Sequence, residues 1–274
     1  MATAFICATC GAQYPPSAEP PTACALCLDE RQYVGWDGQE WTTLAELRAE
    51  YRADIRAEEP GLTGIGSTPS FAIGQRALLV ETAAGNVLWD CLAPFDDEVV
   101  EAVRARGGIE AIAISHPHYY TTMVDWSGAF DAPIHLPAAD REWVTRPDPA
   151  VEFWDGDRLD LPGGLTLLRL GGHFAGGTVL HWPAGAEGRG ALLSGDILQV
   201  VSDRRWVSFM RSYPNLIPLP AAKVEAMVAA LESFEFDRVY GAWFGRVIDA
   251  DGHDAVRRSA ARYVRAVTEG FGDD

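Results

Sequence analysis

The chain has 274 residues, of which 22 are Lys or Arg and 39 are Asp or Glu, giving a formal net charge of −17 at pH 7. This charge argues against general binding to nucleic acid or to an anionic membrane surface, because phosphates would be repelled. The hydrophobic fraction of 48% excludes a mostly disordered chain, and no apolar run approaches the roughly 20 residues that span a bilayer. The opening MATAFICATC lacks the basic and apolar regions of a signal peptide, so we expect a cytoplasmic protein.

The first 35 residues contain two Cys-x2-Cys pairs. Cys7 and Cys10 are separated by thirteen residues from Cys24 and Cys27. Because thiols stay reduced in the cytosol, this spacing predicts a four-thiolate metal site in a small module over residues 1–35. The pattern resembles zinc ribbons and also rubredoxin-like modules that bind iron. We expect a structural zinc, although iron accepts the same ligands, and no nucleic-acid contact, since Arg31 is the only basic residue of the module.

Residues 36–64 are expected to form a linker and a helix. Thr43 and Glu46 match a capping box, and apolar residues at helical spacing predict a helix over about 43–57. The following segment 61–70, GLTGIGSTPS, is expected to be a glycine-rich loop. It lacks the spacing of the known phosphate-binding loops, so we do not expect it to bind a nucleotide.

Residues 65–274 are expected to form the large domain. Strands are predicted within 71–82, at 87–90, 109–115, 133–136, 165–170, 178–182, 191–198 and 237–243, and helices at about 96–106, 137–144, 220–232 and 254–268. The run 109–115, IEAIAIS, is almost wholly apolar, as expected for a strand that is buried on both faces. This order of elements predicts two sheets, or one large sheet, covered by helices.

Three of the six histidines lie just after a predicted strand or between two predicted strands. His116 and His118 come directly after the strand at 109–115, His173 lies in GGHFAGG, and Asp196 follows an apolar strand in LLSGDIL. Each residue alone has an ordinary structural explanation, such as a hydrogen-bonded core histidine, an exposed hairpin or a cap. Together they are ligands that zinc or another divalent metal accepts.

The segments SHPHYYTT, GGHFAGGT and LLSGDIL, in this order, resemble the metallo-β-lactamase-fold hydrolase superfamily. The resemblance covers about residues 65–245 and implies an α/β fold, a four-layer αββα sandwich with a metal site at one edge of the two sheets. It places His116, His118 and His173 as ligands of one metal and Asp196 as the shared carboxylate. Asp90 takes the place of the family's turn aspartate.

The sequence also departs from the pattern of that family. Tyr120 and Thr121 replace an aspartate and a histidine, and Trp243 or Phe244 replaces the final histidine. The replaced side chains hold the second metal in the family, so the resemblance implies a site with one metal.

The resemblance implies metal-assisted hydrolysis of a small ester, thioester, amide or phosphoester, with Asp196 or Tyr120 moving a proton. Arg211 and Tyr213, in the cationic and aromatic stretch 203–215, are candidates for binding an anionic group of a small-molecule substrate. Two alternatives stay open. The protein could be a binding or scaffold protein with a degenerate metal site, or an iron-dependent redox protein that uses the cysteine module. Neither a nucleic acid nor a membrane is an expected partner, and the sequence does not indicate an oligomeric state.

Overall fold

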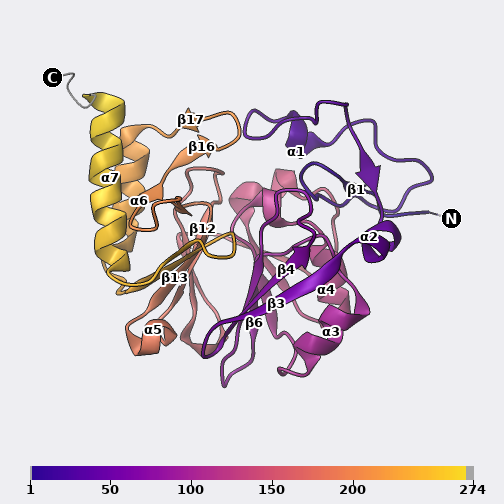
Figure 1. Cartoon of the computed structure of the whole chain (residues 1–274), viewed down its shortest axis with the longest axis horizontal. Helices are drawn as coiled ribbons and strands as arrows, with labels where there is room; N and C mark the ends of the chain where they lie inside the picture. Colours follow the sequence, from indigo (N-terminus) through magenta and orange to yellow (C-terminus); the bar gives the residue numbers. More distant parts are fainter. Residues whose placement is uncertain (1, 270–274) are drawn as a thin grey trace.

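Two β-sheets pack face to face, and helices cover both outer faces (Figure 1). The computed structural model describes residues 2–269. The strand orders are β3-β4-β5-β6-β7-β8-β9 in the seven-stranded sheet and β10-β11-β12-β13-β18-β19 in the six-stranded sheet. A four-layer αββα sandwich is therefore confirmed.

The strands of the seven-stranded sheet are β3 (Arg52–Glu59), β4 (Leu62–Thr68), β5 (Ala77–Val80), β6 (Val87–Trp89), β7 (Ala111–Ala113), β8 (Ile134–Pro137) and β9 (Val151–Trp154). Those of the six-stranded sheet are β10 (Arg158–Asp160), β11 (Thr166–Arg169), β12 (Thr178–Trp182), β13 (Ala191–Gly195), β18 (Arg238–Gly241) and β19 (Val247–Ile248). The short pairs β14 (Gln199–Val200) with β15 (Val207–Ser208), and β16 (Met210–Ser212) with β17 (Ile217–Pro218), extend beyond the second sheet.

Alternation along the strands sorts their side chains between the layers. In β6, Val87 and Trp89 face the apolar core between the sheets, whereas Leu88 faces the outer core under the helices. Ile112 of β7 also faces the outer core, and its two strand neighbours face inward. Because successive side chains of a strand point to opposite faces, a continuous apolar run fills both cores at once.

The helices cover opposite outer faces. On one face lie α3 (Asp97–Arg104) and α4 (Met123–Phe130), and on the other α6 (Ala221–Leu231) and α7 (Gly252–Thr268) (Figure 1). Asp96 caps α3 by accepting the Val99 N–H at 2.9 Å, which satisfies a donor that the first turn leaves free. Short helical turns complete the domain: α5 (Gly185–Gly188), η1 (Pro117–Tyr119), η2 (Ala138–Trp143) and η3 (Pro162–Gly164).

The N-terminal module contains β1 (Ile6–Cys7), α1 (Ala25–Leu28) and β2 (Trp41–Thr42), and β1 pairs with β2. The helix α2 (Leu44–Glu50) follows it, and Thr43 caps α2 as expected, accepting the Glu46 N–H at 3.2 Å. The module lies across one end of the sandwich, beside the β16–β17 hairpin (Figure 1). Arg211 of the hairpin pairs with Glu30 of the module.

Two expectations about residues 43–70 are wrong. The helix ends at Glu50 rather than near residue 57, and the expected glycine-rich loop is mostly strand β4. The sheet therefore begins at Arg52, and a domain boundary at residue 65 would cut through it. Gly64 and Gly66 are suited to β4 because a Cβ atom there would lie only 2.7 Å and 2.5 Å from the Phe244 ring.

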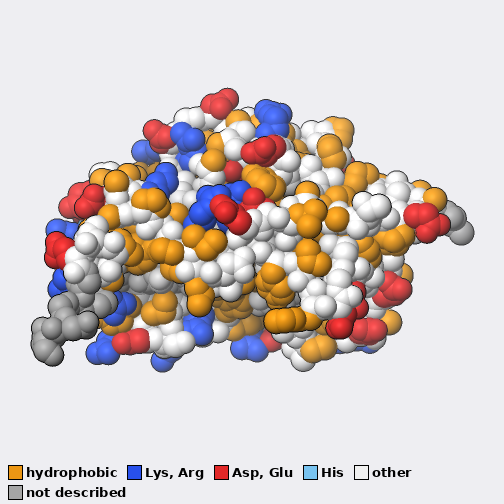
Figure 2. Space-filling view, turned by 90° about the horizontal axis from the view of Figure 1, so that it is seen from above, with side chains coloured by type: hydrophobic (Ala, Val, Ile, Leu, Met, Phe, Trp, Pro, Cys, Tyr) orange, Lys and Arg blue, Asp and Glu red, His pale blue; other side chains and the backbone are white. Residues whose placement is uncertain are grey.

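Charged side chains of both signs are interspersed over the face that carries the module and the β16–β17 hairpin (Figure 2). None of the helices within residues 2–269 is long and apolar enough to cross a membrane.

Candidate metal centre

Three histidines from two distant segments converge at the end of the sandwich that the module covers. His116 and His118 flank the start of η1, just after β7, and His173 lies in the loop between β11 and β12. Their ligand nitrogens all lie within 4.8 Å of one another, and His118 Nδ1 is 3.2 Å from His173 Nε2. Metal–nitrogen distances of about 2.0–2.1 Å in a tetrahedral site correspond to nitrogen separations of about 3.3 Å. The three imidazoles therefore fit a single divalent metal.

Hydrogen bonds orient the His116 ring toward this point. Ser115 Oγ lies 2.9 Å from His116 Nδ1, which leaves Nε2 facing the site, 3.3 Å from Asp196 Oδ1. The Ser115 backbone N–H donates to the buried Asp90 carboxylate at 2.7 Å. Gly195 brings β13 close to this serine, since a Cβ atom on Gly195 would lie 2.7 Å from Ser115 Oγ. Such outer partners fix the tautomer and direction of a ligating histidine.

The three imidazoles are held in the neutral form that binds metals. Burial lowers the pKa of His173 to about 4 and lowers the pKa values of His116 and His118 well below their usual range. The neighbouring imidazoles disfavour protonation of His116 and His118 further. His116 Nε2 is buried and, although Asp196 Oδ1 lies 3.3 Å away, forms no hydrogen bond with the described residues. An unpartnered, neutral, buried nitrogen is costly unless a ligand such as a metal satisfies it.

Asp196 lies at the same point, just after β13. Burial raises the pKa of its carboxyl to about 7, and the neighbouring Tyr119 hydroxyl partly offsets this rise. The ring of Tyr119 packs 4.3 Å from that of His116. The Tyr213 hydroxyl donates to the Asp196 backbone carbonyl at 2.8 Å, so Tyr213 fixes the backbone of this aspartate. Burial also raises the pKa of Tyr213 well above its usual range.

The three side chains that replace second-metal ligands in the resembling family lie in different surroundings. Tyr120 is buried in the outer core under α3 and α4 and does not line the cavity at the histidines. Thr121 packs against the module, where a Cβ atom on Gly11 would lie 3.3 Å from its Cγ2. Trp243 lines the cavity, and its Nε1 donates to the Ile73 carbonyl at 3.0 Å. Within residues 2–269, the only groups of three or more metal-binding side chains are the histidine cluster and the four cysteines.

The four cysteines form the second cluster. The Sγ atoms of Cys7 and Cys27 lie 3.5 Å apart, and those of Cys10 and Cys24 lie 3.6 Å apart. These separations exceed the roughly 2.05 Å of a disulfide and approach the edge of about 3.8 Å expected for a tetrahedron with Zn–S bonds of about 2.3 Å. Gln39 Nε2 donates to Cys7 Sγ at 3.2 Å, which favours a thiolate there. The four thiols fit a tetrahedral metal, as the sequence predicts.

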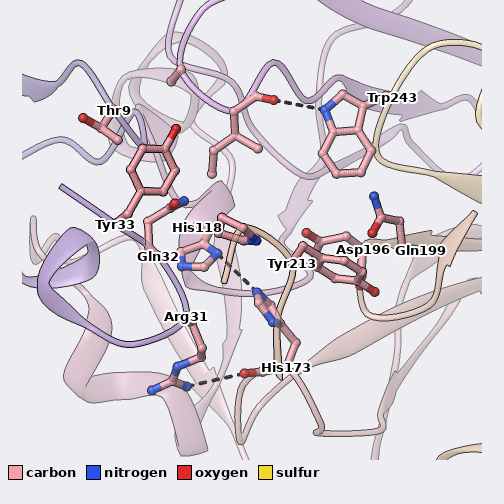
Figure 3. A pocket seen from close by; sticks show the side chains of 13 residues that line it. Thr9, Arg31, Gln32, Tyr33, His118, His173, Asp196, Gln199, Tyr213 and Trp243 are labelled. Atoms are coloured by element: carbon pink, nitrogen blue, oxygen red, sulfur yellow. Dashed lines mark hydrogen bonds between the residues drawn. The ribbon is translucent and has the colours of Figure 1, made fainter. Parts of the chain in front are cut away.

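His118 and His173 open into a cavity of about 300 Å³ (Figure 3). The large domain contributes Ala72, Ile73, His118, His173, Asp196, Gln199, Tyr213, Pro214 and Trp243, and the module contributes Thr9, Arg31, Gln32 and Tyr33. The cavity includes Asp196 and Tyr213 among the residues singled out in the sequence. Arg211 lies outside it and pairs through Nε with Glu30 at 2.5 Å, joining the hairpin to the module.

Sequence reasoning missed the contribution of the module to this cavity. Arg31, noted in the sequence only as a lone basic residue, places its guanidinium 4.0 Å from the ring centre of Phe174, next to His173. Phe174 packs into the same apolar cluster as the four cysteines. Arg31 also donates a hydrogen bond of 3.5 Å to the His173 carbonyl, 142 positions away in the sequence. Neither spacing nor periodicity in the sequence indicates such a contact.

Comparison with solved structures identifies the fold of the chain. The DIM-1 metallo-β-lactamase matches with a TM-score of 0.60 at 13% identity, covering 79% of this chain and 99% of that one. A B3 metallo-β-lactamase with an active-site glutamic acid matches with 0.53 at 18% identity, covering 81% and 95%. A metallo-β-lactamase of Cronobacter sakazakii matches with 0.52 at 18% identity, covering 82% and 96%. The chain has the metallo-β-lactamase fold, with a cluster of three histidines and an added four-cysteine module.

Sequence comparison identifies a relative of the chain. The chain is 50% identical over 265 residues to the uncharacterized protein YmaE of Bacillus subtilis (strain 168), covering 96% of each protein. It belongs to the same family as YmaE. No family model matches the chain.

Proposed function

We propose that the protein is a metal-dependent hydrolase that acts on a small ester, thioester, amide or phosphoester with one metal in its active site. The observation that carries this proposal is the convergence of three buried, neutral imidazoles on one point of a cavity, beside a carboxylate. A divalent cation held there supplies Lewis acidity, which polarises a scissile carbonyl or phosphoryl group and makes water a better nucleophile.

The residues of the chain have separate roles in this proposal. His116, His118 and His173 bind the metal, zinc being the first candidate because it accepts three histidines with an open fourth position. Asp196 accepts and returns the proton of the attacking water, because its carboxyl lies at the site and its pKa is near neutrality. Tyr120 is not assigned a proton-transfer role, since it packs in the outer core and does not line the cavity.

We assign the four-cysteine site a structural zinc. It lies within the apolar cluster that holds the module together, and the module has too few large apolar residues for an independent core. Four closely spaced thiols without a disulfide also support a reducing compartment such as the cytoplasm.

Metal analysis and hydrolysis assays of the purified full chain test the proposal together. We expect two zinc ions per chain, with one remaining in a His118→Ala variant and that variant losing hydrolysis of ester, thioester, amide and phosphoester substrates. Tyr33→Phe, which keeps both sets of metal ligands, serves as the control for metal content. A chain that binds zinc at the histidines and hydrolyses none of the four classes would instead support the binding-protein alternative. Iron at both sites would support the redox alternative.

A further inference from the structure

One wall of the active-site cavity is built by the four-cysteine module. Gln32 and Tyr33 lie on this side of the cavity, and Trp243, Gln199 and Tyr213 lie on the other, with His118 and His173 between them (Figure 3). The module is therefore part of the site that the proposed function uses, and its side chains face whatever occupies the cavity.

The wall is held rigidly by the β16–β17 hairpin. Asn215 Nδ2 donates to the backbone carbonyls of Glu30 and Gln32, each at 2.9 Å, and Ser212 Oγ donates to the Arg31 carbonyl at 3.1 Å. The Gln32 N–H in turn donates to the Asp29 carbonyl at 3.0 Å. The backbone that carries Gln32 is thus fixed on both sides, which reduces the entropy lost when its side chain binds a ligand.

The Gln32 side chain has an unused hydrogen-bonding atom at the cavity. Only 6% of this residue is exposed, and its Oε1 is buried without a partner among the described residues. Buried polar atoms are nearly always paired, and an unpaired one is costly. Gln32 lines the cavity, so an N–H or O–H group of a ligand would pair with this oxygen once the amide turns toward the ligand.

Away from the proposed metal, the side-chain charges of the cavity favour an uncharged ligand group. Among the described residues that line it, Arg31 and Asp196 are the charged ones. Arg31 is occupied by Asp29, with an Nε–Oδ1 distance of 2.5 Å and an Nη2–Oδ2 distance of 3.0 Å. An anionic group that does not bind the metal would therefore meet Asp196 without an unpaired cation among the lining residues, whereas the oxygen of the Gln32 amide accepts from a neutral donor.

We propose that Gln32 is a substrate-binding and specificity-determining residue, and that the substrate presents to it an uncharged N–H or O–H donor such as a carboxamide. This inference rests on the proposed function, because it places the substrate in the cavity at the histidines. The four-cysteine module then has a role in substrate recognition, in addition to holding a structural metal.

Three small hydroxamic acids test the inference by calorimetry on the zinc-loaded full chain. They share one metal-chelating head and end in a carboxamide, a carboxylate or a methyl group. We expect the carboxamide compound to bind about tenfold more tightly than the methyl compound, the effect of one buried hydrogen bond, and the carboxylate compound to bind most weakly. Binding of none of the three would overturn the proposed function and this inference with it. Equal binding of all three overturns the inference alone.

Two substitutions assign the preference to Gln32. In Gln32→Leu, the carboxamide and methyl compounds should bind equally, within about twofold. In Gln32→Glu, which keeps an acceptor of the same shape, the carboxamide compound should still bind, and the carboxylate compound should weaken by a further tenfold or more. Leu28→Ala, an exposed residue of the module outside the cavity, is the control and should keep the preference of the original chain. If Gln32→Leu keeps the tenfold preference for the carboxamide compound over the methyl compound, another residue accepts the hydrogen bond. Zinc content of two per chain verifies that each variant has folded.

Discussion

At the scale of single residues, the candidate site depends on polar side chains that are buried and oriented by neighbours outside the site. Ser115 orients His116, and the backbone of Ser115 is in turn held by Asp90, whose pKa burial raises to about 7. Asp140 supports the loop of His173 by accepting the Gly176 N–H at 2.7 Å. These residues bind no metal in our assignment, yet the position of each imidazole depends on them.

Ser115→Ala should weaken metal binding at the histidines without removing a ligand. Losing the hydroxyl frees His116 Nδ1 and lets the ring change tautomer or rotate, so we expect a 10- to 100-fold loss of zinc affinity. Competition with a chromophoric chelator measures this affinity. Ser127→Ala also removes a buried hydroxyl, one that donates to the Ala132 carbonyl at 2.7 Å, and should leave zinc affinity unchanged. Equal losses in both variants would point to general destabilisation.

Asp140→Asn should make stability less dependent on pH. Burial raises the pKa of Asp140 from its ordinary 3.8 to about 6, so the folded state binds the proton more tightly than the unfolded state. Its contribution is present below pH 4 and is lost as pH rises through 6, because the fold must then hold a buried charge. Asparagine keeps an acceptor for Gly176 and carries no charge, so we expect a gain of about 1–2 kcal/mol in the free energy of unfolding at pH 8 and little gain at pH 4.5. Denaturant titrations of both proteins at the two pH values measure the difference, and an equal change at both would contradict it.

At the scale of elements, the module and the loop between β11 and β12 form one packed unit. Phe174 of the loop belongs to the apolar cluster of the four cysteines, and Arg31 stacks on Phe174 at 4.0 Å and on Trp143 at 4.9 Å. A metal at the cysteines therefore supports the segment that carries His173, which lies in a different part of the sequence.

Cys27→Ser should affect both metal sites. Removing one thiolate abolishes tight metal binding by the module, and loss of the packed cluster should loosen the loop of His173. We expect loss of one zinc per chain, a lower Tm and at least tenfold weaker zinc binding at the histidines, measured by metal analysis, calorimetry and chelator competition. Cys91→Ala, which removes the buried cysteine outside the module, should keep two zinc ions. Unchanged affinity at the histidines in Cys27→Ser would show that the two sites are independent.

At the scale of the whole molecule, the sandwich fixes where the ends of the two sheets meet, and the module occupies the space beside them. Thr121 packs against the backbone of the module, Trp243 bonds to the Ile73 carbonyl, and Tyr120 is buried in the outer core. Each position that holds a second metal in the resembling family is thus filled by packing.

Restoring the ligand types should therefore fail to restore a second metal at the histidine site. The combined variant Tyr120→Asp, Thr121→His and Trp243→His should still bind two zinc ions per chain, counting the one at the cysteines, and should be less stable. A buried carboxyl would replace a core tyrosine, and an imidazole at 121 would meet the module backbone at Gly11. Metal analysis after dialysis against zinc gives the count, and three ions per chain would contradict this account.

The sequence by itself determined the elements whose signal is local. The apolar strands β6 and β7 and the helices α3 and α7 lie close to where periodicity predicts them. The four cysteines and the three histidines were also recognisable, because their residue types and order carry the signal. The family resemblance supplied the pairing of the sheets, which periodicity does not.

Only the tertiary structure decided how the module and the cavity fit together. β4 is a strand although its glycines favour a loop, because Phe244, far along the chain, fills the space above them. Arg211 contacts the module rather than the cavity, and Gln32 reaches the cavity from a segment that the sequence marked only as metal-binding. These positions depend on contacts between residues more than a hundred positions apart, and local propensity contains no information about such contacts.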